Sequence, residues 1–555
     1  MRFRNHIILS ILPILFLALS VPARTSELNR YWVEFSDKGR WELLSHEALR
    51  AEAMAQGLTD AALERRRIEG IAEADLVTVA DLPPDPGYIS KVAATGANIR
   101  QLSRWFNLVS VEAVPEVVER FSELPFVKSV KPVGAMQPTY SEYEIVGTFD
   151  GMPAPGPGID AAGSYGPSYR QALQINAVEA HREGYTGHGV LMAVIDGGFT
   201  LDHEAFERID VVGTYDVTDN EEIVSQEPKD APGQTAHGTL CLSTIAGYSP
   251  GNLIGIAYEA SFLLVKSEYV PTETIQEEDD YVAGLEWAER LGVRVTSSSL
   301  GYSDWYNEAM IDGDVPITSR AITRAREMGI VCCTSAGNEG PQPRTLGPPG
   351  DNWGGLTMGA VDSLGRIAKF SSRGPTSDGR TKPDLVARGV KCIIVAPLTH
   401  HFYAVANGTS LSTPVVAGAA TLVRGAHPDW SATKVIRAMK STASRAERPD
   451  NAYGWGIPDV MAAIRYPELR LIFETPDSDA VSGIEVSLSG PDGTQISSAS
   501  DKRGVVTFPN LPEGVWSYQA QLPDGTELST GNSSGSLDIV DSRTLRFRVS
   551  RMSSE

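Results

Sequence analysis

Cysteine is scarce in this sequence, with 4 residues among 555. Apolar side chains make up 42% of the chain, which is ample for cores packed without cross-links. Cys332 and Cys333 are neighbours in an apolar run that predicts a strand, so their side chains should point to opposite faces. A disulfide framework is the alternative, because four cysteines allow three full pairings. We expect mostly free, buried thiols at Cys241, Cys332, Cys333 and Cys392.

Positive charge is also in short supply. The chain has 48 Lys and Arg against 70 Asp and Glu, which gives a formal net charge of −22. This balance argues against nucleic acid or an anionic membrane as the main partner. We therefore expect no nucleic-acid partner and interpret most of the excess charge as a solvated acidic surface.

Long apolar runs are confined to the start of the chain. Residues 7–21 are almost wholly apolar after two arginines, and Val21-Pro22-Ala23 is small enough for a signal-peptidase site. This pattern predicts a secretory signal peptide over residues 1–23. A membrane anchor is the alternative, but the run is short and Pro13 interrupts it. We expect export to the medium, the periplasm or the cell surface, and no membrane span after signal removal.

The segment Asn407–Pro414 carries the first sign of chemistry. Its first residues are compatible with a turn, and residues 415–420 are small and apolar, as in a buried helix. Ser410 should therefore lie at or near a helix N-terminus, where backbone N–H groups favour a developing negative charge. Pro414 is tolerated if it lies in the first turn or so of that helix. An N-capping serine without a catalytic role is the alternative.

Three other segments supply complementary groups. Leu191–Gly198 is an apolar run ending in Asp-Gly-Gly, which predicts a buried parallel strand with Asp196 at its carboxyl end. His237 precedes a helical stretch, and Asn338 lies in a loop after another apolar run. Asp, His and Ser can act as orienter, base and nucleophile, and the Asn amide can stabilise an oxyanion.

With these motifs in the order Asp, His, Asn, Ser, residues 165–466 resemble the subtilisin-like serine peptidases. The motifs Phe370–Pro375 and Lys382-Pro383-Asp384 belong to the same pattern. The resemblance implies an α/β fold with a doubly wound, mostly parallel sheet. The alternation of predicted strands, Cys392–Val395 among them, with predicted helices such as 174–183 favours the same fold. It also implies a catalytic triad of Asp196, His237 and Ser410, with Asn338 in the oxyanion hole. The implied substrate-binding residues are Ser299, Leu300, Gly301, Ser335, Ala336 and Gly337.

Three positions depart from the family pattern: Gly197 after the Asp, Tyr302 after Ser-Leu-Gly, and Leu411 after the Ser. None of them removes a reacting group, so the departures concern local geometry and subsite shape. Cys241 follows His237 by one helical turn and should lie close to the triad.

The chemistry needs no cofactor. Subtilases often hold structural Ca²⁺, and Asp202, Asp312 and Asp314 are candidate oxygen ligands. Isolated acids are more often simply solvated, so we assign no metal site.

The regions on either side of the peptidase have different patterns. Residues 24–140 resemble the ferredoxin-like α+β propeptides of secreted subtilases, with a helix expected in 47–74 and strands in 99–111 that carry Trp105 and Phe106. By resemblance, this region would template folding and inhibit the enzyme with its C-terminal tail in the cleft. Gly and Pro residues in 141–164 predict a processing linker. Strand alternation and turn signals in 467–555 predict a small β-sandwich, similar to carboxypeptidase-regulatory-like modules, which we expect to stabilise the enzyme.

The sequence thus predicts a secreted, self-processed serine endopeptidase that cleaves polypeptide substrates through an acyl-enzyme. We expect a monomer, with the propeptide as intramolecular inhibitor. A catalytically silent scaffold is one alternative, which only Gly197 favours. An esterase or lipase is another, but Ser412 stands where the G-x-S-x-G elbow requires its second Gly.

Overall fold

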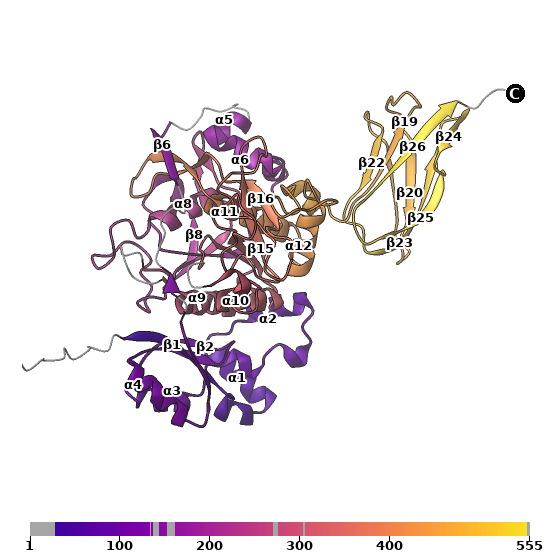
Figure 1. Cartoon of the computed structure of the whole chain (residues 1–555). Helices are drawn as coiled ribbons and strands as arrows, with labels where there is room; N and C mark the ends of the chain where they lie inside the picture. The colour runs from indigo at the N-terminus through magenta and orange to yellow at the C-terminus, as the bar shows by residue number, and fades with distance from the viewer. Residues whose placement is uncertain are drawn as a thin grey trace, which may run out of the picture.

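The computed structural model describes residues 28–133, 135–136, 144–152, 161–269, 276–302 and 306–551. It contains an N-terminal α+β region, a central α/β domain and a C-terminal β-sandwich (Figure 1). The predicted signal peptide, residues 141–143 and 153–160 of the predicted linker, and residues 270–275 lie outside the described residues. In the part that is described, no helix is both long and apolar enough to cross a membrane.

The central domain is built on a seven-stranded parallel sheet in the order β16-β15-β14-β13-β7-β11-β8. These strands are nearly continuous apolar runs because both faces of the sheet are covered. Their bounds are β7 Leu191–Asp196, β8 Asp210–Asp216, β11 Ser261–Lys266, β13 Val295–Ser298, β14 Val331–Ser335, β15 Leu356–Val361 and β16 Leu385–Arg388. The fold class predicted from the sequence is therefore confirmed.

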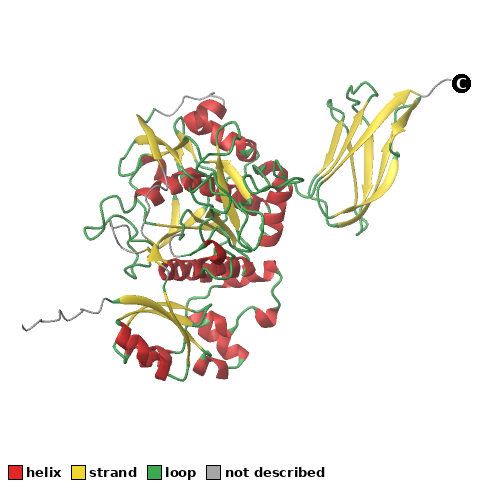
Figure 2. Cartoon of the chain, viewed as in Figure 1, coloured by secondary structure: helices red, strands yellow, loops and turns green. Residues whose placement is uncertain are grey.

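Helices pack on the sheet of the central domain (Figure 2). The buried side chains on the two faces of this sheet form two separate cores. On one face, α8 (Ala236–Ala246) and α11 (Thr409–Ala426) pack with α6 (Tyr169–Gln174), α7 (Ala177–Arg182), α12 (Ala432–Ser441) and α13 (Val460–Ile464). On the other face lie α9 (Glu278–Arg290) and α10 (Ile317–Glu327). Cys333 belongs to the first core and Cys332 to the second, as strand alternation predicts. All four cysteines are buried and free.

Two predictions for the central domain were wrong. Cys392–Val395 forms a strand, β17, but it pairs antiparallel with β18 (Phe402–Asn407) in a separate small sheet. The helix expected over 174–183 begins only at Ala177, as α7, because Asn176 adopts a left-handed conformation with φ of 60° and separates α7 from α6.

The N-terminal region is a four-stranded antiparallel sheet, β2-β3-β1-β4, that packs beside α9 and α10 (Figure 1). Its strands are β1 Asn29–Phe35, β2 Asn98–Ser103, β3 Leu108–Ala113 and β4 Val127–Pro132, and its outer helices are α3 Pro86–Ala93 and α4 Pro115–Glu119. Trp105 and Phe106 lie in the turn between β2 and β3 and not within a strand, which corrects the prediction.

The helical stretch at 47–74 also differs from the prediction. It forms two helices, α1 (His46–Ala55) and α2 (Asp60–Glu69). The side chains of Ser45 and Thr59 cap them by accepting the backbone N–H groups of Ala48 and Ala62. Because Thr59 begins a new helix, α2 can turn back onto the central domain.

Two short strands after the N-terminal region pair with the central domain. β5 (Ala135–Met136) pairs antiparallel with β12 (Gln276–Glu277), which directly precedes α9. β6 (Glu144–Asp150) pairs antiparallel with β18, the strand that leads to α11. The remaining short elements there are α5 Ala161–Tyr165, β9 Tyr248–Ser249 and β10 Leu253–Ile254.

The C-terminal region is a β-sandwich of two four-stranded sheets with its own apolar core around Trp516. One sheet is β22-β19-β26-β24 and the other is β21-β20-β23-β25. The bounds are β19 Leu469–Glu474, β20 Glu485–Ser489, β21 Gln495–Ala499, β22 Val505–Phe508, β23 Gly514–Gln521, β24 Thr526–Thr530, β25 Ser534–Ile539 and β26 Arg543–Arg551. Arg437 on α12 reaches Glu513 at 2.6 Å and so joins the sandwich to the central domain.

Candidate active site

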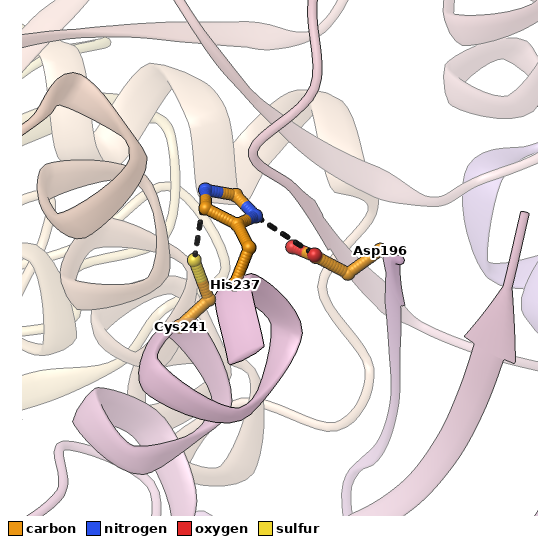
Figure 3. Close-up of side chains that lie close together, drawn as sticks. All are labelled: Asp196, His237 and Cys241. Atoms are coloured by element: carbon orange, nitrogen blue, oxygen red, sulfur yellow. Dashed lines mark hydrogen bonds and ion pairs between the residues drawn. The ribbon is translucent and has the colours of Figure 1, made fainter. Parts of the chain in front are cut away.

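Asp196 and His237 meet at the carboxyl edge of the parallel sheet (Figure 3). Asp196 ends β7, and His237 is the second residue of α8. The His237 Nδ1 to Asp196 Oδ1 distance is 2.8 Å, and the Gly197 N–H donates to the same oxygen at 2.8 Å. The two side chains are buried, with exposed fractions of 1% for Asp196 and 6% for His237.

The buried carboxylate makes this imidazole a strong base. Burial by itself would lower the pKa of His237, but the charge of Asp196 raises it well above its usual value. When Nδ1 donates to Asp196, Nε2 is the nitrogen that can accept a proton. The pair is therefore arranged as a general base held by an orienting carboxylate.

Ser410 is the second residue of α11, which begins after Gly408. Its exposed fraction is 2%, and its Oγ donates to the Ser299 carbonyl at 3.4 Å. Pro414 lies beyond the first turn, inside the helix, so the prediction of its place was slightly wrong. Because proline has no N–H, it leaves the carbonyl of Ser410 without the usual helical donor. That carbonyl instead accepts the Ser299 Oγ at 2.9 Å and the Cys241 Sγ at 3.3 Å.

Asn338 is fixed by the residue before Ser410. Its Oδ1 accepts the backbone N–H and the Oγ1 hydroxyl of Thr409, both at 2.9 Å. These bonds define which end of the amide is the oxygen and orient the Nδ2 donor. An oriented amide donor next to a helix N-terminus is suited to stabilising an oxyanion.

The two predicted substrate-binding segments follow neighbouring strands. Ser299-Leu300-Gly301 follows β13, and Ser335-Ala336-Gly337 spans the end of β14. The Ser335 Oγ donates to the Leu300 carbonyl at 3.3 Å, which ties the segments together. The Gly337 carbonyl accepts the Thr409 Oγ1 at 3.2 Å, so the second segment is also joined to the start of α11.

Two glycines at the site were not singled out by sequence reasoning. Gly198 has φ of 125°, and a Cβ there would lie 2.9 Å from the Val224 carbonyl oxygen. A Cβ at Gly238 would collide with the Gly198 carbonyl oxygen. The start of α8 therefore packs backbone to backbone on the end of β7. The signal was in the sequence, since Gly follows each polar residue: Asp196-Gly197-Gly198 and His237-Gly238.

Leu411 and Tyr302, which depart from the family pattern, and Cys241 beside the triad all lie in buried positions. Leu411 is fully buried, and Tyr302 is 2% exposed and packs edge-on against Tyr281 at 5.9 Å between ring centroids. Cys241 lies behind the imidazole, with its Sγ 3.9 Å from His237 Nε2 (Figure 3). Burial raises the pKa of this thiol, which keeps it protonated at neutral pH.

The candidate Ca²⁺ ligands are engaged in local contacts. Asp202 lies 3.3 Å from His400, and Asp312 accepts the N–H groups of Asp314 and Val315 at 2.9 Å. A closer group of acids, which sequence reasoning missed, lies around β8. Its members are Asp216, Asp219, Glu221 and Glu227.

Two ammonium groups already serve as cations in this group of acids. Lys229 Nζ lies 2.7–3.1 Å from Asp219, Glu221 and Glu227, and Lys266 Nζ lies 2.7 Å from Asp216. We assign no metal there.

A seven-stranded parallel sheet with Asp, His, Asn and Ser motifs in this arrangement is the fold of a subtilisin-like serine peptidase. The sequence profile of the subtilase family matches residues 187–456, and that of the Bacteroidota peptidase S8 propeptide domain matches residues 30–143. The chain belongs to the subtilase family, and it is a serine endopeptidase with a propeptide domain.

Individual relatives agree with this assignment. Serine protease AprX of Bacillus subtilis (strain 168) is 31% identical over 314 residues, covering 51% of this chain and 68% of the relative. Subtilisin E of the same strain is 32% identical over 294 residues, covering 52% and 69%. Among solved structures, fervidolysin from Fervidobacterium pennivorans, a keratinolytic enzyme related to subtilisin, aligns with a TM-score of 0.54. That alignment covers 94% of this chain and 78% of fervidolysin at 17% identity, so it supports the fold alone.

Proposed function

We propose that this chain is a secreted zymogen whose triad is Asp196, His237 and Ser410. The observation that carries the proposal is the buried hydrogen bond between Asp196 and His237 at the edge of the sheet where α11 presents Ser410. His237 takes the Ser410 proton as Oγ attacks the scissile carbonyl, and Asp196 stabilises the imidazolium. The amine leaves with that proton, and water then hydrolyses the acyl-enzyme by the same route.

The oxyanion is received by the Asn338 amide and the Ser410 backbone N–H. The bonds from Thr409 to Asn338 Oδ1 support this role because they orient the donor before the substrate binds. Ser299-Leu300-Gly301 and Ser335-Ala336-Gly337 hold the substrate backbone. No cofactor takes part in these steps.

The N-terminal region acts as folding template and inhibitor of the same chain. The pairing of β5 with β12 and of β6 with β18 supports this role, because it leads the segment after the propeptide across the central domain. We place the propeptide at 24–140, the processing linker at 141–164, the peptidase at 165–466 and the sandwich at 467–555. The precursor is exported by a signal peptide over 1–23, and the mature enzyme acts as a monomer.

An activity-based probe tests the proposal. A fluorophosphonate should label the mature protein and should not label Ser410→Ala, and casein should be cleaved faster than a simple ester. Equal labelling of both proteins would refute the assignment of Ser410. Ester hydrolysis without casein hydrolysis would favour an esterase, and no labelling of a folded protein would favour a silent scaffold.

A further inference from the structure

The propeptide covers an acidic side of α9. Four carboxylates on this helix, those of Asp279, Asp280, Glu286 and Glu289, are each at most 5% exposed in the precursor. We call this side, with these four residues, the α9 acidic face. Helix α2 and strand β2 of the propeptide lie over it (Figure 1).

The C-terminal half of the face is neutralised by propeptide arginines. Glu289 pairs with Arg65, with Arg66 at 3.0 Å and with Arg104 at 2.5 Å. Burial opposes its ionisation, but these guanidinium groups outweigh burial and lower the pKa of Glu289. Glu286 accepts the Ser103 hydroxyl at 2.6 Å and the Arg104 backbone N–H at 2.9 Å.

The N-terminal half of the face is also paired with residues of the propeptide. Arg100 lies 3.3 Å from Asp279 and 3.1 Å from Asp280. Gln101 donates to Asp280 at 2.8 Å, and the Ser110 hydroxyl donates to Asp279. The described ion pairs of the whole face are therefore made with residues of the propeptide domain.

Removal of the propeptide leaves a charged surface without these partners. Four carboxylates on one helix face repel one another, and two of them lie near the helix C-terminus, where the dipole disfavours negative charge. In the mature enzyme they regain water, so they ionise at neutral pH and attract cations.

A substrate can reach this surface along the course of the propeptide. β5 pairs with β12 immediately before α9, and the propeptide body precedes β5 in the chain. If the enzyme cuts a peptide bond within the linker, as the proposed function holds, the propeptide lies on the N-terminal side of that bond. A protein substrate aligned on β12 places its own N-terminal side over α9.

We propose that the α9 acidic face of the mature enzyme is an exosite that selects protein substrates with an arginine-rich surface N-terminal to the scissile bond. This inference rests on the proposed proteolytic function. Its recognition chemistry is the one seen in the precursor, guanidinium groups on the carboxylates of one helix.

Two fusion substrates with one shared cleavage sequence test the exosite. One has an arginine-rich folded domain N-terminal to the cleavage sequence, and the other has the same domain with Gln in place of the surface arginines. The mature enzyme should cleave the first with a kcat/KM about tenfold higher at low salt, and about 0.5 M NaCl should abolish the difference. A short chromogenic peptide with the same cleavage sequence measures the active enzyme in each preparation.

Variants and salt separate the outcomes. The ratio of the two kcat/KM values should fall to about one in Glu286→Gln/Glu289→Gln and stay high in Glu179→Gln, which changes an exposed acid of α7. If the double variant does not fold, the salt dependence of the wild-type ratio decides. If the enzyme cleaves the chromogenic peptide but the two fusion substrates have equal kcat/KM values at low salt, the exosite is overturned and the proposed function stands. Absence of both peptide cleavage and fluorophosphonate labelling overturns the proposed function.

Discussion

At the scale of single residues, the proposed role of Asn338 in the oxyanion hole can be tested separately from folding. Asn338→Ala should keep the substrate KM near its wild-type value and lower kcat, because the proposed oxyanion donor would act on the transition state and not on the ground state. Loss of one such donor costs about 10²–10³ in turnover in subtilisin itself, and we expect a similar effect here. Steady-state kinetics on a peptide substrate measures it. An unchanged kcat would show that Asn338 is not an oxyanion donor.

Cys241 offers a second residue-scale prediction. Its thiol lies against the imidazole of His237, so a bulky mercurial bound there should displace the base and inhibit the enzyme. Cys241→Ala should keep most of the activity and lose the sensitivity to the mercurial. Full inhibition of the Ala variant by the same reagent would place the effect at another cysteine.

At the scale of elements, the contact of α2 with α9 depends on Glu289. Glu289→Gln leaves Arg65, Arg66 and Arg104 buried without their shared anion, and breaking a buried pair in this way costs about 3–5 kcal/mol. We expect the variant enzyme to bind the isolated propeptide much more weakly than wild type does. The inhibition constant of the propeptide added in trans measures this.

The pH dependence of this contact has a definite sign. Because the pKa of Glu289 is lowered in the complex, its contribution is fully present above the ordinary Glu pKa and is lost as the pH falls through and below that value. The gap in affinity between wild type and Glu289→Gln should therefore be widest at pH 6–7 and shrink below about pH 4.5. A gap that does not vary with pH would show that the carboxylate charge is not responsible.

The elements differ in how far the sequence alone could predict them. The strand ending at Asp196 and the helix opened by His237 were predicted correctly, because a long apolar run and a short polar motif fix them locally. Composition did not reveal the division of 47–74, since Thr59 caps a new helix between two equally helical segments. The Cys392–Val395 strand was assigned to the wrong sheet because strand propensity does not specify a partner.

The candidate site could also be predicted only in part from the sequence. The types and order of its residues were readable, and the family follows from them. The freed carbonyl of Ser410 and the fixed amide of Asn338 depend on residues brought together only by the fold. The arginine contacts to α9 join residues more than 170 positions apart, which no local pattern reports. The catalytic assignment, the domain limits and the role of the sandwich stay predictions.

At the scale of the whole molecule, the precursor should process itself. A parallel sheet depends on non-local contacts and folds slowly, so we expect the docked propeptide to assist its folding. We predict that Ser410→Ala accumulates as an uncut precursor that lacks only the signal peptide. Immunoblotting of the exported protein measures its size.

A truncated chain provides the complementary test. A protein that starts near Tyr165 should fold poorly unless residues 24–140 are supplied in trans. If Ser410→Ala appears at the mature size in the native host, another protease makes the cut and self-processing is refuted.

The central sheet also separates two thiols that are neighbours in the chain. Cys332 lies in the core that includes Trp32, Leu108 and Val133 of the propeptide region, whereas Cys333 lies in the core on the opposite face. When the propeptide leaves, the core around Cys332 loses the side chains that the propeptide region contributes, whereas the core around Cys333 loses none of its described side chains. In pulsed alkylation followed by mass spectrometry, Cys332 should therefore react faster in the mature enzyme than in the precursor, while Cys333 keeps one slow rate in both. The alkylation rate of Cys332 thus reports whether the propeptide is bound, and the rate of Cys333 is the control in the same molecule. Equal acceleration of both rates would show that the sheet does not isolate its two sides.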